Sequence, residues 1–146
     1  MSNLLHVGLD VGSTTVKIVV MDDKLNTIYR DYQRHFSDTK NTVCNVLEGL
    51  AEKYPDSEFT IALTGSGAMS AAKFLDLPFI QEVVSCKRAV EKYIPKTDVV
   101  IELGGEDAKI IYFDKSIEQR MNGSCAGGTG AFIDQMASLL NTDPTG

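Results

Sequence analysis

The residues best suited to chemistry gather in one short stretch near the N-terminus. Residues 7 to 22 read Val-Gly-Leu-Asp-Val-Gly-Ser-Thr-Thr-Val-Lys-Ile-Val-Val-Met-Asp. One apolar run reaches Asp10 and a second begins at Val16, with a small, hydroxyl-rich segment between them. This pattern predicts a β-hairpin whose turn brings N–H and O–H groups close to a ligand. Phosphate binds such donors, and a carboxylate at a strand end can hold a divalent cation through water.

Each residue of this hairpin can be given an expected role. Asp10 is placed to hold Mg2+ through water, because it lies where the first strand ends. The turn residues expected to contact phosphates are Gly12, Ser13, Thr14 and Thr15. Lys17 follows on the second strand and can add positive charge, although a solvent-facing lysine is the alternative.

The same pattern recurs 92 residues further along the chain. Residues 99 to 114 read Val-Val-Ile-Glu-Leu-Gly-Gly-Glu-Asp-Ala-Lys-Ile-Ile-Tyr-Phe-Asp. At this constant offset, the matching pairs are Asp10 with Glu102, Gly12 with Gly104, Ser13 with Gly105, Thr15 with Asp107 and Lys17 with Lys109. One glycine-turn hairpin is a weak signal, but two copies with matching acid, glycine and lysine indicate an internal repeat. Two unrelated structural hairpins are the alternative.

Composition and charge limit the function classes. The chain has 146 residues, of which 43% are hydrophobic, and a net charge of −6. These values are typical of a soluble globular protein and argue against a nucleic-acid partner, which would favour a basic surface. The sequence has neither a long apolar run nor a basic leader, so we expect a cytoplasmic protein with no membrane partner. Its three cysteines, Cys44, Cys86 and Cys125, are then thiols or metal ligands.

The elements that must position these residues follow from hydrophobic periodicity. Strands are expected at 4–11, 16–21, 25–36 and 59–63, helices at 43–54, 67–75 and 85–93, and a short strand or edge at 78–84. Further strands are expected at 98–103, 108–113 and 116–121, with an apolar-faced helix at 129–140. We therefore expect two α/β units, residues 1–96 and 97–146. The second would be incomplete by about 50 residues, so that the chain is a fragment.

Two units that each open with a phosphate-binding hairpin resemble the actin, chaperone-ATPase and sugar-kinase superfamily. The resemblance implies a ribonuclease H-like (actin-like ATPase) fold, with a mixed five-stranded sheet flanked by helices in each unit. It also implies that ATP and Mg2+ lie in the cleft between the units, with one hairpin on each side of the phosphates.

A narrower resemblance lies in residues 122–136, which read Asn-Gly-Ser-Cys-Ala-Gly-Gly-Thr-Gly-Ala-Phe-Ile-Asp-Gln-Met. This stretch is similar to the Cys-Ala-x-Gly-Thr-Gly-x-Phe-x-Asp segment of the activators of 2-hydroxyacyl-CoA dehydratases, which are related to the ATPase subunits of benzoyl-CoA reductase. That family implies a homodimer with one 4Fe-4S cluster at its interface. ATP hydrolysis would be coupled to delivery of a low-potential electron to a dehydratase-type partner enzyme.

The resemblance makes Cys125 a cluster ligand. It precedes the expected helix, whose N-terminus favours an anionic thiolate, and the small residues after it let N–H groups approach cluster sulfurs. The alternative is a buried small hydrophobe. The family's second cluster cysteine and its adenosine-binding glycine segment are not matched within these 146 residues. We therefore expect this stretch alone to lack a stable cluster and to bind nucleotide weakly or not at all.

The same resemblance gives catalytic roles to Asp10, Glu102 and Glu106, and phosphate contacts to Gly104, Gly105 and Asp107. The sequence departs from the family at several positions. Glu102 and Glu106 stand where Asp and Gln are usual, Ala68 replaces an Arg, and Lys87 replaces a His after Cys86, which we interpret as structural.

Two other functions remain open. A small-molecule kinase of the N-acetylhexosamine type would share the hairpins and use an acid such as Asp107 toward its sugar, but would have no use for Cys125. A non-catalytic scaffold would keep the fold without turnover, which Glu106 in place of a water-positioning Gln leaves possible.

Overall fold

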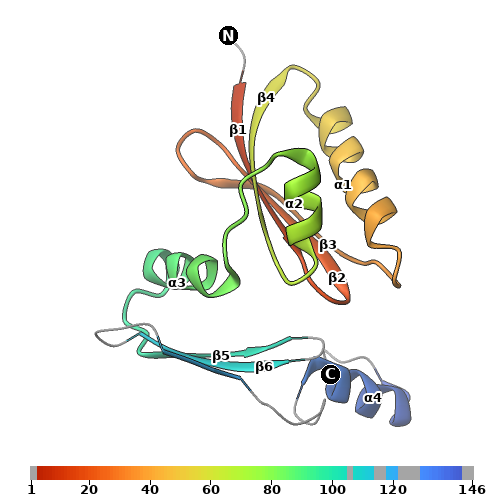
Figure 1. The fold of residues 1–146 in the computed structure, drawn as a ribbon, viewed down its shortest axis with the longest axis vertical. Coiled ribbons are helices and arrows are strands. Elements are labelled where there is room, and N and C mark those ends of the chain that lie inside the picture. Colours follow the sequence, from red (N-terminus) through yellow and green to blue (C-terminus); the bar gives the residue numbers. More distant parts are fainter. Residues whose placement is uncertain (1–2, 105–106, 114–117, 122–128, 143–146) are drawn as a thin grey trace. The chain divides into compact units, whose positions relative to one another are not determined.

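The computed structural model of the chain describes residues 3–104, 107–113, 118–121 and 129–142. The chain divides into two compact units, residues 1–82 and 83–146 (Figure 1). Compactness alone does not define a subdomain, so the boundary expected after residue 96 stays a prediction.

The first unit is built on a four-stranded sheet in the order β3-β2-β1-β4 (Figure 1). Its strands are β1 (Asn3–Val11), β2 (Thr15–Met21), β3 (Thr27–Arg34) and β4 (Ser57–Thr64). The β1–β2 and β2–β3 pairs are antiparallel, whereas β1 and β4 are parallel. The short strand expected near residue 80 is reduced to a single parallel bridge between Leu63 and Phe79. The described sheet is therefore mixed and has four strands. In place of the expected fifth strand there is a single bridge.

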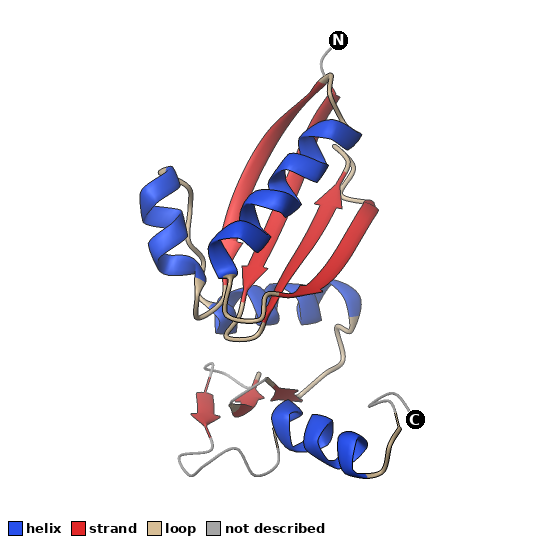
Figure 2. Cartoon of the chain, turned by 90° about the vertical axis from the view of Figure 1, so that its right-hand side faces the viewer, coloured by secondary structure: helices blue, strands red, loops and turns tan. Residues whose placement is uncertain are grey.

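The core of the first unit lies on one face of this sheet. Alternate residues of the two central strands are buried there: Leu5, Val7, Leu9 and Val11 from β1, and Val16, Ile18 and Val20 from β2. The helices α1 (Thr39–Lys53) and α2 (Ala68–Leu75) add Val43, Val46, Leu50, Ala68 and Ala72 to the same cluster. Figure 2 shows α1 lying along the sheet. Each large buried side chain contributes about 1.5–3 kcal/mol, so this face dominates the stability of the unit.

Helix α1 begins four residues earlier than expected. The Asp38 side chain accepts a hydrogen bond from the Asn41 N–H and caps the helix, so Thr39–Thr42 is helical although it is polar. The periodicity of apolar residues could not detect this first turn.

The second unit contains a three-stranded antiparallel sheet in the order β5-β6-β7. Its strands are β5 (Val99–Leu103), β6 (Ala108–Tyr112) and β7 (Glu118–Met121), preceded by α3 (Glu82–Tyr93) and followed by α4 (Gly130–Leu139). Ala137 of α4 is buried, but Leu139 and Leu140 at its end are 74% and 75% exposed. The apolar face expected on this helix is thus only partly covered by the described residues. The predicted α/β class and the βββαβα order of the first unit are confirmed.

Candidate functional site

The first hairpin has the register that its sequence predicts. Asp10 pairs with Lys17 and Val11 with Val16 across β1 and β2. The turn between them is closed by the Gly12 N–H, which donates to the Thr15 carbonyl at 2.9 Å. Because Leu9 and Ile18 point into the core, their neighbours Asp10 and Lys17 point to the opposite face of the sheet.

Asp10 and Lys17 form an ion pair on that face. The Lys17 Nζ lies 2.8 Å from Asp10 Oδ2, and the two side chains are 41% and 35% exposed. The same ammonium lies 5.8 Å from the centroid of the Tyr32 ring. Lys17 is thus directed at the carboxylate at the head of the turn while it stays partly exposed to solvent, and its expected contact with phosphate stays a prediction.

The tip of the turn presents hydrogen-bond donors to solvent. Ser13 and Thr14 are exposed, and no residue in the described part of the chain accepts a hydrogen bond from either backbone N–H. Gly12 and Thr15 differ, because the Gly12 N–H is used within the turn and Thr15 is only 6% exposed. The geometry therefore makes Ser13 and Thr14 the most available donors among the four expected phosphate contacts.

A second loop is hydrogen-bonded to the end of β1, next to this turn. The sequence analysis does not assign this loop to the site. The Gly67 N–H donates to the Val11 carbonyl at 2.8 Å. Gly65 has φ +104°, and a Cβ there would lie 2.2 Å from the Val11 oxygen and 2.6 Å from Asp10 Oδ1. Only glycine fits this contact. The glycine-rich stretch Thr64-Gly65-Ser66-Gly67 between β4 and α2 is the sequence signal that could have identified this loop. The loop lies beside Asp10 because β4 pairs in parallel with β1 and Thr64 is the partner of Asp10.

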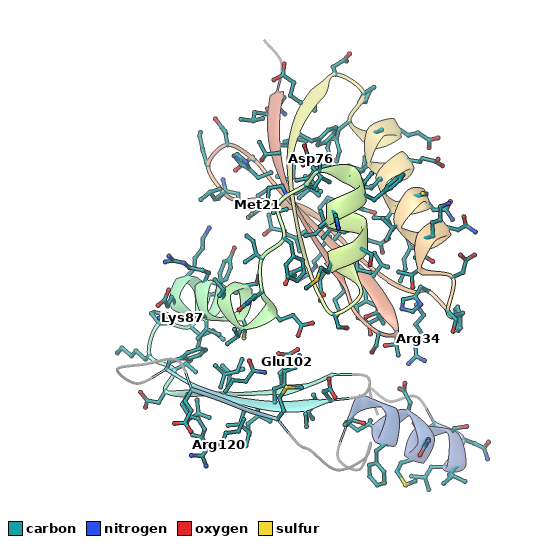
Figure 3. All side chains as sticks on the ribbon, viewed as in Figure 1. Met21, Arg34, Asp76, Lys87, Glu102 and Arg120 are labelled. Carbon is teal, nitrogen blue, oxygen red and sulfur yellow. The ribbon has the colours of Figure 1, made fainter. Side chains whose placement is uncertain are left out.

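The second hairpin repeats the geometry of the first. Glu102 pairs with Lys109 across β5 and β6, and the Gly104 N–H donates to the Asp107 carbonyl at 2.7 Å. These positions match Asp10, Lys17 and the Gly12–Thr15 bond at the same offset of 92 residues. The predicted repeat is therefore a structural one. Figure 3 labels Glu102 on β5, where its Oε1 lies 3.9 Å from the Lys109 Nζ.

The start of α4 is attached to this second turn. The Gly130 N–H donates to the Gly104 carbonyl at 2.8 Å, and the preceding Thr129 is 1% exposed. The expected site residues Gly105, Glu106 and Cys125 lie outside the described residues.

The other cysteines have different environments. Cys44 on α1 is exposed. Burial raises the pKa of the Cys86 thiol on α3, the Glu102 carboxylate raises it further, and Lys109 opposes them. Cys86 is thus stabilised as a neutral thiol, in keeping with its interpretation as structural.

The described residues contain neither a cluster of metal ligands nor a helix that could span a membrane. Within them, no three or more His, Cys, Asp or Glu side chains are grouped so as to hold a metal ion. None of the helices described is both long and apolar enough to cross a membrane.

Comparison with known protein families decides the family. The BadF/BadG/BcrA/BcrD ATPase family matches residues 7–144. The chain belongs to this family. One relative is the (R)-2-hydroxyglutaryl-CoA dehydratase activating ATPase of Acidaminococcus fermentans, which is 32% identical over 144 residues that cover 94% of this chain and 54% of the relative. The chain spans about half the length of the curated relatives that it matches.

Solved structures of this family share the fold. The activator of the 2-hydroxyisocaproyl-CoA dehydratase from Clostridium difficile, with bound ADPNP, superposes with a TM-score of 0.79 at 30% identity and covers 96% of this chain and 53% of that one. Component A of the Acidaminococcus fermentans (R)-2-hydroxyglutaryl-CoA dehydratase gives a TM-score of 0.76 at 26% identity, covering 97% and 56%. These likenesses confirm the actin-like ATPase fold class, and the chain covers about half of each of the two structures.

Proposed function

We propose that the two hairpins form the ATP-phosphate-binding part of an ATPase that activates a 2-hydroxyacyl-CoA dehydratase-type enzyme. The observation that carries the proposal is the duplicated hairpin, in which an acid, a closed glycine turn and a lysine occupy matching positions. Family membership and the similarity to an activator with bound ADPNP support ATP as the nucleotide.

The first hairpin suits a hydrated cation beside phosphate. Asp10 offers a partly exposed carboxylate, and the exposed Ser13 and Thr14 in the turn that follows it offer their backbone N–H groups. Mg2+ keeps most of its water ligands and needs few protein oxygens, so a single carboxylate at this position fits it. The bound cation would neutralise charge on the phosphates, while Lys17 holds Asp10 in place and adds a second positive charge.

The second hairpin would bind phosphate through Gly104, Gly105 and Asp107, with Glu102 and Glu106 as its acids. Its attachment to α4 through the Gly104–Gly130 hydrogen bond offers a route from nucleotide to the segment that carries Cys125. A shift of this turn on nucleotide binding would move the start of α4, because the two are joined backbone to backbone.

Cys125 would ligate a 4Fe-4S cluster in a homodimer, and this part of the proposal rests on the Cys-Ala-x-Gly-Thr-Gly resemblance. The cluster would supply a low-potential electron for the partner enzyme. A partner of the dehydratase class is supported by the relatives, which are named as activators of 2-hydroxyglutaryl-CoA, 2-hydroxyisocaproyl-CoA and lactoyl-CoA dehydratases.

The test is an iron and acid-labile sulfide determination on the full natural protein, prepared without oxygen. We expect about four irons per dimer, lost in Cys125→Ala and kept in Cys44→Ala, which alters an exposed cysteine on α1. Absence of iron from the wild-type protein would overturn the proposal that Cys125 binds a 4Fe-4S cluster. Binding of ADPNP that is equal in wild type and Asp10→Asn would overturn the phosphate site.

A further inference from the structure

His35 is a buried histidine that the proposed function does not use. It directly follows Arg34, which ends β3 (Figure 3), and is 6% exposed. All four of its polar groups are bonded. The His35 N–H donates to the Thr14 carbonyl (3.1 Å), the His35 carbonyl accepts from the Asp38 N–H (2.7 Å), Nδ1 accepts from the Ser37 N–H (3.1 Å), and Nε2 faces the Gly12 carbonyl (3.2 Å).

These contacts fix the tautomer of the ring. Nδ1 accepts a hydrogen bond from the Ser37 N–H, so it carries no proton in this arrangement. The proton of the neutral imidazole therefore lies on Nε2, which donates it to the Gly12 carbonyl. The ring thus links two backbone groups that are 25 residues apart in the chain.

His35 holds both sides of the Ser13 tip. Its ring binds the Gly12 carbonyl, and its backbone binds the Thr14 carbonyl. In a trans peptide the carbonyl and the following N–H point in opposite directions, and the described chain contains no cis peptide. With the Gly12 carbonyl held toward His35, the Ser13 N–H must point away from the His35 ring.

The chain adopts a strained path to place this ring. Phe36 and Ser37 both have left-handed conformations, with φ of 46° and 69°. Such values are unfavourable for residues other than glycine. The Phe36 side chain is 84% exposed, so burial of its ring does not offset the strain. The bonds made by His35 are the visible compensation.

We infer that His35 is a positioning residue for nucleotide binding. Its ring keeps the Ser13 N–H directed at a phosphate by holding the Gly12 carbonyl, and its backbone bond to the Thr14 carbonyl fixes the other side of the tip. This inference rests on the proposed function, since it assigns the turn its ligand. It predicts that the Nε2–H donor, rather than the bulk of the ring, is what binding requires.

Three substitutions in the full natural protein separate the donor from the bulk. His35→Gln places an amide N–H at the reach of Nε2. His35→Asn has a shorter amide that reaches only the Nδ1 position, and His35→Ala has no polar group at either position. We expect ADPNP affinity to fall about tenfold or more in the Asn and Ala variants and by about threefold or less in Gln, the range expected for one hydrogen bond that orders a charged contact. For ATP turnover, KM should rise with little change in kcat.

A second readout needs no nucleotide. Hydrogen exchange of the Gly12 amide reports whether the turn is closed, because that N–H is bonded to the Thr15 carbonyl. Its protection should be kept in His35→Gln and lost in His35→Asn. The control is His6→Gln, which alters the histidine that pairs with Thr60 inside the sheet and should change neither readout.

The outcomes distinguish the two proposals. Wild-type protein that binds no ADPNP would overturn the proposed function, while Gly12 protection would still decide whether His35 holds the turn. If His35→Ala binds ADPNP as tightly as the wild-type protein does, the inference about His35 is overturned and the proposed function is not. A Gln variant as weak as the Asn variant, with the same cooperative unfolding transition, would also overturn it, because the donor would then be irrelevant.

Discussion

At the scale of single residues, Asp10 lies between Lys17 of the first hairpin and the loop that contains Gly65. Its Oδ2 binds the Lys17 ammonium at 2.8 Å, and its Oδ1 faces the backbone at Gly65. The lysine balances the charge of the carboxylate in the absence of a cation, and its exposure leaves it free to move toward an incoming phosphate.

Replacing Lys17 should therefore affect binding more than stability. The pair is more than one-third exposed, so Lys17→Met should change the free energy of unfolding by about 1 kcal/mol or less. Loss of one positive charge near the phosphates should weaken ADPNP binding about tenfold, measured by calorimetry. Lys24→Met, in the exposed Asp22 turn, is the matched control and should leave affinity unchanged. Equal affinities in the two variants would contradict a role for Lys17.

Gly65 and Gly49 should respond to alanine with opposite signs. Gly65→Ala forces a Cβ against the Val11 carbonyl at positive φ, and should lower the free energy of unfolding by about 1–3 kcal/mol. Gly49→Ala, on an exposed position of α1 with nothing within 4 Å of the new methyl, should raise it by about 0.5–1 kcal/mol. Urea unfolding midpoints measure both. A tolerated Gly65→Ala would show that the loop does not pack on β1.

At the scale of elements, charged residues of the second hairpin act on Cys86 of α3. The thiol lies on α3, while the two charges that act on its pKa, Glu102 and Lys109, come from β5 and β6. The reactivity of this cysteine therefore reports how the helix packs on the sheet within the second unit.

Neutralising Glu102 should make Cys86 more reactive. The carboxylate disfavours the thiolate, so Glu102→Gln should lower the pKa of Cys86 and speed its alkylation by iodoacetamide near pH 8, by about two- to fivefold. Burial persists and is the larger cause, so the pKa should stay above its usual value. The rate should be followed against pH in a background where Cys86 is the only cysteine.

Two variants check the sign and the specificity of this effect. Lys109→Met should slow alkylation, because the lysine favours the thiolate. Glu91→Gln removes a carboxylate on α3 that pairs with Lys87, and should leave the rate unchanged. Equal rates in the Glu102 and Glu91 variants would mean that the Glu102 carboxylate does not act on the Cys86 thiol.

At the scale of the whole molecule, the repeat raises the question of whether the two hairpins serve one ligand. A double-mutant cycle answers it without reference to how the units are arranged. Asp10→Asn and Glu102→Gln should each weaken Mg-ADPNP binding about tenfold in the full natural protein, as expected for charged contacts. The change in binding free energy of the double variant should depart from the sum of the two single changes by about 0.5–3 kcal/mol.

The control cycle combines Glu102→Gln with Asp22→Asn, whose carboxylate binds Asn26 in an exposed turn at the other end of β2. This pair should be additive. Additivity of the Asp10 and Glu102 effects would instead mean that the hairpins bind different ligands or act independently.

Much of the candidate site follows from local sequence. Alternating apolar residues around a glycine turn define each hairpin, and its register sets Asp10 opposite Lys17 and Glu102 opposite Lys109. The repeat can also be recognised from the sequence, because a constant offset between two matching patterns does not depend on how the chain packs. The first turn of α1 was missed because its signal is a polar cap at Asp38 instead of apolar periodicity.

The sequence by itself thus determined the α/β class, the two hairpins and their chemical groups, since these depend on residues that are neighbours along the chain. Only the tertiary structure decided that Lys17 bonds to Asp10, that the Gly65–Gly67 loop supports the end of β1, and that His35 returns to hold Gly12. The last two contacts join residues more than 20 positions apart in the chain. They depend on the parallel β1–β4 pairing and on the strained turn after β3, and no local pattern specifies either.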